Sequence, residues 1–512
     1  MRTRFAGALV LSAFSLSSGA FAQSPLRYTV DLNDRFGHEF KVSLRVDSLP
    51  ASASVYQFAA TAPGTYQVMN IGRFVRRFQA FDAAGKEIAT QHASINQWRM
   101  SDPQRVREIR YSVAETIGSG VKEDPIYPMC GTALRSDYAL MNGQGVFGFP
   151  SGMQSAPVSV TLLRPAAWIV GTPLRRTATT FEADDYDQLV DSPILAGDLT
   201  TASLDLGGVP VELYSYSPSH VITAAQLLGS MRSMLTSAAT FLGKLPVDHY
   251  TFLYDFLKPA MRGNGAWEHS YGSEYTLNET PFSDEFGKNV TDIAAHEFFH
   301  VVTPLNLHSE IVEHFNFETP VPSRHLWLYE GTTEWAAHKM QLESQLKTPA
   351  AYLATIVDKS RADRTAYDTT WSLLKMSLTS YSDSGQAQYP NIYQRGAIVA
   401  GLLDIKLLEL SNGAHGLRDL IADLGREYGK KRAFPDDSLF DIIVARTSPD
   451  LRDFFARYIE RAEHPPIAEY YEKLGIKLVS DAHGLPVKFE IGASPTAEQL
   501  RLRQAWLGGA RR

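Results

Sequence analysis

Two histidines stand four residues apart in the sequence HEFFH, at positions 296–300, with a glutamate beside the first of them. On an α-helix, residues i and i+4 share one face, so His296 and His300 can both direct a ring nitrogen at a single ion. Glu297 would then lie beside the ion, where a carboxylate can take a proton from ion-bound water and pass it to a leaving amine. The spacing therefore predicts a zinc site with its own general base.

Apolar residues flank this motif on both sides. We expect a helix that Asn289 or Thr291 caps and that Pro304 ends. The alternative is that the histidines are ordinary buried side chains with satisfied nitrogens, which is common for a single histidine. Two histidines and an acid in one apolar helix favour a metal, because all three groups are costly to bury without partners.

A third ligand is needed, because a catalytic zinc normally takes three protein ligands and keeps one position open. In HLWLYEGTTEW, at 325–335, Glu330 follows an apolar run and Glu334 comes one helical turn later. Glu330 is the predicted third ligand, and Glu334 is the candidate to accept a hydrogen bond from a ligand imidazole. The alternative is a packed helix followed by a solvated turn.

The pattern of apolar and polar residues along the chain predicts an α+β fold. Short alternating runs broken by turn residues, from about 28 to 206, indicate an antiparallel sheet arranged as a sandwich. Beyond them we expect a helix at 223–245, strands at 249–256 and 266–277, and amphipathic helices at 350–375, 396–410, 416–428 and 436–463. The expected parts are a β-rich N-terminal domain (23–207), a domain carrying the HEFFH motif (208–345), a helical domain that completes the site (346–465) and a short C-terminal tail (466–512).

The N-terminus has the order of a signal peptide, with Arg2 and Arg4 before an apolar run and Ala20-Phe21-Ala22 after it. We expect cleavage after Ala22 and a periplasmic or secreted protein; the alternative is a disordered or core-forming N-terminus. The apolar run is short and rich in serine, and no later segment offers about twenty uninterrupted apolar residues, so no stable membrane span is expected.

Composition limits the remaining possibilities. The formal charge is −7, whereas a nucleic-acid binder usually has an excess of basic residues, so nucleic-acid binding is not expected. Cys130 is the single cysteine, which excludes an internal disulfide. A hydrophobic content of 44% in 512 residues is typical of packed globular domains. The oligomeric state is not indicated.

Several stretches together resemble one family. HEFFH followed by LWLYEGTTEW is similar to the zinc metallopeptidases in which a glutamate on a second helix completes the ligand set, such as thermolysin and aminopeptidase N. The chain most resembles the glycyl aminopeptidase family. TAPGTYQVMNIGRFVRRFQAFDAAGKEI (61–88) resembles its N-terminal signature, NGAWEH (264–269) its Gly-Gly-Leu-Glu-His segment, and IYQRGAIVAGLLDI (392–405) its Tyr-x-Lys-Gly helix start.

This resemblance implies a thermolysin-like catalytic domain with one zinc ion, held by the three predicted ligands. It implies that Glu268 faces the free amine of the substrate and that Tyr393 donates a hydrogen bond to the oxyanion. Gly265 would let the substrate backbone approach the strand closely. Without the family, Glu268 would be a solvated strand residue and Tyr393 a packed tyrosine at a helix start.

The chain also departs from the family pattern. No tryptophan-bearing sequence follows His300, and Ala266-Trp267 replaces a small and aliphatic pair, so Trp267 would narrow the first specificity pocket or stack on a substrate side chain. The segment after Leu478 leaves no room for the PDZ domain that family members commonly carry. We expect an exported zinc metallopeptidase acting on peptides or proteins, an aminopeptidase that releases glycine or alanine. The alternatives are an endopeptidase with an open groove and a catalytically idle scaffold that binds peptides.

Overall fold

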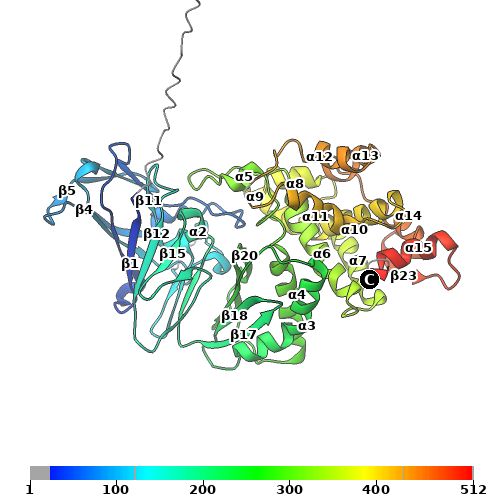
Figure 1. Ribbon diagram of the computed structural model, residues 1–512, viewed down its shortest axis with the longest axis horizontal. Coiled ribbons are helices and arrows are strands. Elements are labelled where there is room, and N and C mark those ends of the chain that lie inside the picture. Colours follow the sequence, from blue (N-terminus) through cyan, green and yellow to red (C-terminus); the bar gives the residue numbers. More distant parts are fainter. Residues whose placement is uncertain (1–23, 120, 122, 431, 510–512) are drawn as a thin grey trace, which may run out of the picture.

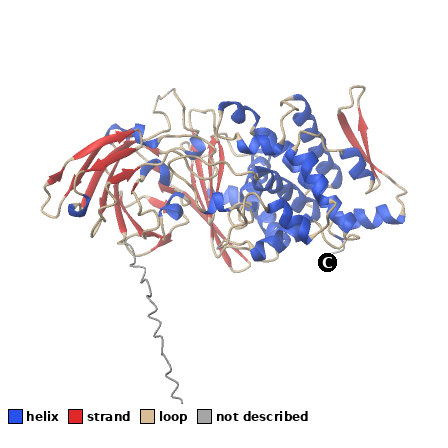
Figure 2. Cartoon of the chain, turned by 90° about the horizontal axis from the view of Figure 1, so that it is seen from above, coloured by secondary structure: helices blue, strands red, loops and turns tan. Residues whose placement is uncertain are grey.

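The computed structural model describes residues 24–119, 121, 123–430 and 432–509. The predicted signal peptide, with its cleavage site after Ala22, lies outside these residues. The described chain runs from a β-rich end to a helical end, with a mixed sheet and its helices between them (Figures 1 and 2). The predicted α+β class is confirmed, and within the described residues no helix combines the length and the apolar character needed to cross a membrane.

The N-terminal domain is built from three sheets, ordered β14-β15-β12-β1-β2-β8-β4-β5, β11-β3-β7-β6 and β13-β16-β10-β9. Buried and more exposed residues alternate along its strands, so one face of the sheet packs into the core. In β1, for example, Leu26, Tyr28 and Val30 are buried, while their neighbours are exposed or half-buried. The elements are β1 Leu26–Asp31, β2 Glu39–Arg45, β3 Val55–Gln57, β4 Val75–Phe81, β5 Glu87–Ile88, β6 Thr90–Ser94, β7 Gln97–Met100, β8 Glu108–Ala114, β9 Ala133–Leu134, β10 Tyr138–Met141, α1 Gly143–Val146, β11 Phe149–Pro150, β12 Val158–Leu163, β13 Ile169–Gly171, β14 Arg175–Arg176, β15 Phe181–Ala183, α2 Tyr186–Val190 and β16 Ile194–Gly197.

The central sheet has the order β17-β18-β19-β21-β20, so β20 is an edge strand. Helices α3 and α4 share a core with this sheet, through residues such as Leu227, Phe252 and Val290. A smaller cluster that includes Leu140 and Leu253 joins the sheet to the N-terminal domain. The elements are β17 Thr200–Leu206, β18 Val209–Tyr216, α3 Ala224–Leu242, β19 Tyr250–Leu257, β20 Gly265–His269, β21 Gly272–Asn278 and α4 Asp284–Phe299.

In this region the predicted start of the HEFFH helix was wrong. The predicted domain boundary at 207/208 falls in the turn between β17 and β18, which pair antiparallel within the central sheet. Helix α4 begins at Asp284, because the Ser283 hydroxyl accepts a hydrogen bond from the Phe286 amide (3.1 Å). The expected caps, Asn289 and Thr291, therefore lie inside the helix, and regular α-helix stops at Phe299, before Pro304.

The helical region follows as α5 Glu310–Glu313, the π-helical turn η5 Trp327–Thr332, α6 Thr333–Glu343, α7 Pro349–Thr365, α8 Leu373–Leu378, α9 Asp383–Gln388, α10 Pro390–Leu410, α11 Leu417–Glu427, α12 Leu439–Arg446, α13 Leu451–Phe455 and a second π-turn, η6 Ala456–Glu460. The long helices expected at 350–375 and 436–463 are each broken. Thr370 bonds to the Asp368 carboxylate in the turn before α8, and Pro449, which lacks an amide hydrogen, precedes α13.

The C-terminal segment, expected only as a tail, is folded against the helical region. It comprises α14 Ile467–Glu472, the hairpin β22 Ile476–Ser480 and β23 Pro486–Ile491, and α15 Ala497–Trp506. Trp506 is buried, and its carbonyl accepts a hydrogen bond of 2.5 Å from the buried Lys339 of α6. The Lys339 ammonium also lies 3.1 Å from the Asp404 carboxylate of α10.

Candidate active site

Helix α4 and the turn η5 bring three donor atoms together. The Nε2 atoms of His296 and His300 are 3.1 Å apart, and Glu330 Oε2 lies 3.4 and 3.5 Å from them. All three side chains are buried. These are the three residues that were predicted from the sequence as zinc ligands.

The proton positions in this cluster favour a cation between the three atoms. His296 Nδ1 lies 2.8 Å from Glu334 Oε2 and His300 Nδ1 lies 3.0 Å from the Thr303 carbonyl, so each Nδ1 carries the donated proton. Both Nε2 atoms then present lone pairs to each other and to Glu330 Oε2, which has no hydrogen-bond partner among the described residues. Two nitrogens and a carboxylate oxygen are a ligand set that suits zinc, so the residues fit the metal.

Glu334 lies behind His296, as the sequence suggested. Its other oxygen accepts hydrogen bonds from Lys359 Nζ (2.6 Å) and His338 Nε2 (3.1 Å). Burial opposes ionisation of Glu334, but the bonds with His296 and His338 and the charge of Lys359 hold its pKa well below the usual range. A carboxylate so fixed holds the ring of His296 in one orientation and one tautomer.

Glu297 lies on the same turn of α4, in the cavity next to this cluster. Burial raises the pKa of Glu297 above its usual range; His296 opposes that shift, and the carboxylates of Glu330 and Glu334 add to it. Ligand oxygens of Glu297 and Glu268 and a nitrogen of His300 lie within 4.8 Å of one another. A buried carboxylate with a raised pKa is suited to accept a proton and to return it.

Tyr393 and Tyr389 reach the cluster from the start of α10. The Tyr389 hydroxyl donates to Glu330 Oε1 (3.1 Å) and lies 3.1 Å from the Tyr393 hydroxyl, and the Tyr393 ring is 5.3 Å from that of His296. Tyr393 was predicted as a site residue from the sequence, and Tyr389 was not. The signal that could have found it is the spacing of four residues between the two tyrosines at one helix start.

Edge strand β20 forms another wall of the same space. Gly265 and Glu268 pair with Thr276 and Ser273 of β21, and no described strand pairs with the other edge of β20, the position that an added strand would take. Glu268 is buried and lines the cavity with Ala266. Burial raises the pKa of Glu268 well above its usual range, and Glu330 and Glu297 raise it further.

Trp267 points the other way, because successive side chains of a strand face opposite sides. Its ring packs in the core of the N-terminal domain, and its Nε1 donates to the Pro63 carbonyl (3.1 Å). It does not line the cavity that contains Glu268 and His296. Trp267 instead lines a neighbouring pocket, so its predicted role at the first specificity pocket stays a prediction.

A loop of the N-terminal domain completes the enclosure. Tyr66 lies between the rings of Tyr381 and Tyr389 (5.9 and 5.1 Å), and its carbonyl accepts from Gln386 Nε2 (2.6 Å). Gly64 has a φ of +74°, and a Cβ there would lie 2.7 Å from Glu268 Oε1. No site role was predicted for Gly64 or Tyr66, although both lie in the segment TAPGTY at 61–66.

These walls enclose a space of about 290 Å³, which we call the inner cavity. It contains the three candidate metal ligands, a carboxylate suited to proton transfer, a hydroxyl pair and, at Glu268, a second carboxylate. Such an arrangement can hydrolyse an acyl bond of a substrate that carries a positive charge near that bond.

Two family models match the sequence of this chain. A family model described as the Peptidase M61 N-terminal domain matches residues 27–198, and one described as M61 glycyl aminopeptidase matches residues 289–399. No protein with a curated description matches the sequence.

Solved structures show the same fold at low sequence identity. An aminopeptidase N family protein from Idiomarina loihiensis has a TM-score of 0.79 at 20% identity, over 90% of this chain and 81% of its own. An M1 zinc metallopeptidase from Deinococcus radiodurans has a TM-score of 0.53 at 14% identity, over 87% of this chain and 95% of its own.

Proposed function

Because the chain belongs to the M61 family of glycyl aminopeptidases and is therefore a peptidase, we propose that it is an exported, zinc-dependent aminopeptidase that releases small N-terminal residues, glycine or alanine. The observation that carries this proposal is the position of Glu268. Its carboxylate lines the inner cavity with Glu297 and the three candidate ligands, so an ammonium bound to Glu268 would hold the end of a peptide beside the reacting groups.

In this proposal each side chain has one task. His296, His300 and Glu330 would hold one zinc ion, which supplies a Lewis acid for the scissile carbonyl and lowers the pKa of a bound water. Glu297 takes the proton of the attacking water and passes it to the departing amine. The Tyr393 hydroxyl donates to the developing oxyanion, and Tyr389 keeps Glu330 in place through its 3.1 Å bond.

The enclosure supports a preference for small residues. Tyr66, Tyr389 and Gly64 line the inner cavity together with Glu268, so this cavity by itself leaves limited space beside a bound amine. Edge strand β20 would hold the following residues of the substrate through Gly265, as an added strand.

Export is proposed from the sequence alone, on Arg2, Arg4 and the Ala20-Phe21-Ala22 site. Mass spectrometry of the mature protein should find Gln23 at its N-terminus; an intact Met1 on the active protein would refute export through this site.

The function is tested with peptides that have free or acetylated N-termini, followed by mass spectrometry. We expect the free peptides alone to lose residues in sequence from the N-terminus. Glu268→Gln should lower kcat/KM by about 100-fold, because the substrate ammonium loses a buried charge partner. Glu285→Gln, at an exposed position of α4, is the matched control and should leave the rate unchanged.

Two outcomes would contradict the proposal. Equal internal cleavage of acetylated peptides would identify an endopeptidase with an open groove. Binding of peptides without hydrolysis by zinc-loaded protein would identify an idle scaffold.

A further inference from the structure

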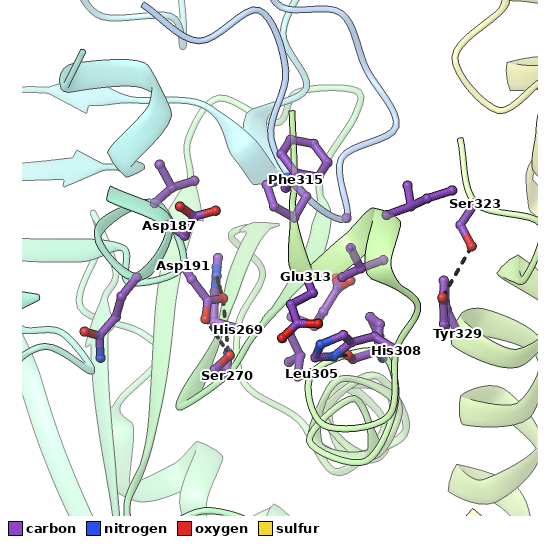
Figure 3. A pocket seen from close by; sticks show the side chains of 18 of the residues that line it. Asp187, Asp191, His269, Ser270, Leu305, His308, Glu313, Phe315, Ser323 and Tyr329 are labelled. Carbon is purple, nitrogen blue, oxygen red and sulfur yellow. Dashed lines mark hydrogen bonds and ion pairs between the residues drawn. The ribbon is translucent and has the colours of Figure 1, made fainter. Parts of the chain in front are cut away.

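A second and larger pocket adjoins the inner cavity. This outer pocket, of about 360 Å³, includes Asp187, Asp191, His269, His308, Glu313 and Phe315 in its lining (Figure 3). Asp187, Asp191 and His269 lie on one side of the view, and His308, Glu313 and Phe315 lie on the other. Gly64, Tyr66 and Glu268 line both the outer pocket and the inner cavity, so the two spaces meet at Glu268.

The outer pocket is strongly acidic. Its described lining residues include six carboxylates, at Asp184, Asp185, Asp187, Asp191, Glu268 and Glu313, against one cationic side chain, Lys430. The Lys430 ammonium lies 3.8 Å from the centre of the Tyr271 ring. Six carboxylates against one ammonium give the pocket an unbalanced negative potential. Burial raises the pKa of Asp187 to about 6, and the neighbouring Asp185 and Asp191 add to that shift.

Two buried histidines contribute ring nitrogens to this lining. His308 Nδ1 donates to the Pro304 carbonyl (2.7 Å) and burial lowers the pKa of His308, so its Nε2 atom is a lone-pair acceptor. His269 Nδ1 lies 3.3 Å from Asp191 Oδ1, and neither Nε2 atom has a hydrogen-bond partner among the described residues. The same combination, an unpartnered buried acceptor in the lining of a cavity, marks Glu330 Oε2 at the metal cluster.

The pocket walls between these polar groups are apolar. Trp267, Leu305 and Phe315 contribute to the lining, and a space of this size and character suits a flexible alkyl chain better than a bare metal ion. Within the described chain, the groups of three His, Cys, Asp or Glu side chains whose ligand atoms converge both include His300 of the inner cavity. The occupant that fits is a long apolar stem with a cationic, donor-rich head.

A substrate residue can reach both spaces at once. The amine and the side chain of an N-terminal residue leave the same Cα, and Glu268, the proposed amine partner, lies where the spaces meet. Glu268 and Trp267 pack closely against the Gly64 backbone at this junction, since a Cβ at that position would lie 2.7 Å from both Glu268 Oε1 and Trp267 Nε1. A thin, unbranched side chain is the shape that suits a junction this narrow.

We propose that the outer pocket binds the side chain of an N-terminal lysine or arginine, so that the enzyme releases these residues as well as glycine and alanine. This inference rests on the proposed aminopeptidase function. Medium-sized, branched or acidic N-terminal residues gain nothing from the pocket, because they are too short to reach its acceptors or carry the wrong charge.

The test uses peptides that differ only in their N-terminal residue: glycine, alanine, lysine, norleucine, arginine and citrulline. Norleucine keeps the stem of lysine without its charge, and citrulline does so for arginine. We expect kcat/KM for lysine and arginine to exceed that for the neutral partner by about tenfold or more. In the Asp187→Asn/Glu313→Gln double variant this ratio should fall toward one, while Asp358→Asn, at an exposed position of α7, should retain it.

Each outcome separates the two proposals. Hydrolysis of the glycine and alanine peptides with lysine no better than norleucine would overturn the outer-pocket assignment and leave the aminopeptidase function standing. Failure of the zinc-loaded enzyme on every free peptide would overturn the function itself. A double variant that melts at the parent temperature and keeps the full lysine preference would also refute the assignment.

Discussion

At the scale of single residues, two neighbouring carboxylates of the site are held in different states. Glu334 accepts hydrogen bonds from His296, His338 and Lys359, which stabilise its charge. Glu297 is buried without a cation of this kind beside it, so its pKa is raised. One carboxylate therefore acts as a fixed anchor, and the other is available to exchange a proton.

Replacement of the proton carrier should separate metal binding from catalysis. Glu297→Gln keeps the size of the side chain but cannot accept the proton of water, so we expect a rate loss of about a thousandfold. Elemental analysis should still find about one zinc per chain, because the three ligands are untouched. Wild-type rates in this variant would show that Glu297 has another role, and loss of zinc would show that it is a ligand.

The convergence of the three candidate ligands could be predicted because their signals are local. His296 and His300 are one turn apart, and Glu330 is recognised by the segment around it. Tyr66 and Gly64 carry no such signal, since they reach the site through tertiary contacts such as the Trp267 to Pro63 hydrogen bond, which joins positions 204 residues apart.

At the scale of elements, the crossing of η5 and α10 positions Glu330. Gly331 and Gly396 meet there: a Cβ on Gly331 would lie 2.6 Å from the Cα of Gly396. Glu330 precedes Gly331, and Tyr389 and Tyr393 stand at the start of α10, so this close approach brings the ligand to its hydrogen-bond partners. A π-turn adds one residue per turn and is often found at functional sites.

Gly331→Ala should force the two elements apart. We expect a destabilisation of about 2 kcal/mol, weaker zinc binding and lower kcat/KM, because Glu330 would be displaced from the histidines. Gly401→Ala is the control on the same helix α10, where a Cβ would make an ordinary contact of 3.5 Å with the Trp335 ring. Thermal melting with zinc titration measures both variants, and equal behaviour of the two would contradict the positioning role of the crossing.

The sequence predicted the elements better than their ends. Ser283 caps α4 six residues before Asn289, because a serine hydroxyl after an irregular segment is as good a cap as the asparagine within the helix. The periodicity of apolar residues also predicted one helix where the structure has α7 and α8, because this periodicity does not reveal the turn between them.

At the scale of the whole molecule, buried acids lie where the N-terminal domain meets the central sheet. Asp255 of β19 is fully buried, and neither of its oxygens has a hydrogen-bond partner among the described residues. Glu274 of β21 accepts a hydrogen bond from Asn142 of the N-terminal domain (3.1 Å). Burial raises the pKa of Asp255 to about 7, and the nearby Arg135 opposes this shift.

Stability should therefore fall as pH rises. The pKa of Asp255 is about 3.8 when unfolded and about 7 when folded, so the native state binds more protons between these values and loses stability across that window. Asp255→Asn cannot ionise, so above pH 7 we expect it to be more stable than the parent by on the order of 2 kcal/mol. Denaturant unfolding at pH 4 and pH 8 measures the difference; an equal effect of the substitution at both pH values would contradict ionisation as the cause.

The contact between α15 and Lys339 makes the C-terminal helix a support of the site. Lys339 lies on α6, the helix that carries Glu334, and one of its acceptors is the carbonyl of Trp506 in α15. Proteolytic cleavage between β23 and α15 would leave the buried Lys339 ammonium without that acceptor and uncover α6. We therefore expect the cleaved protein to lose activity although every residue of the inner cavity is intact.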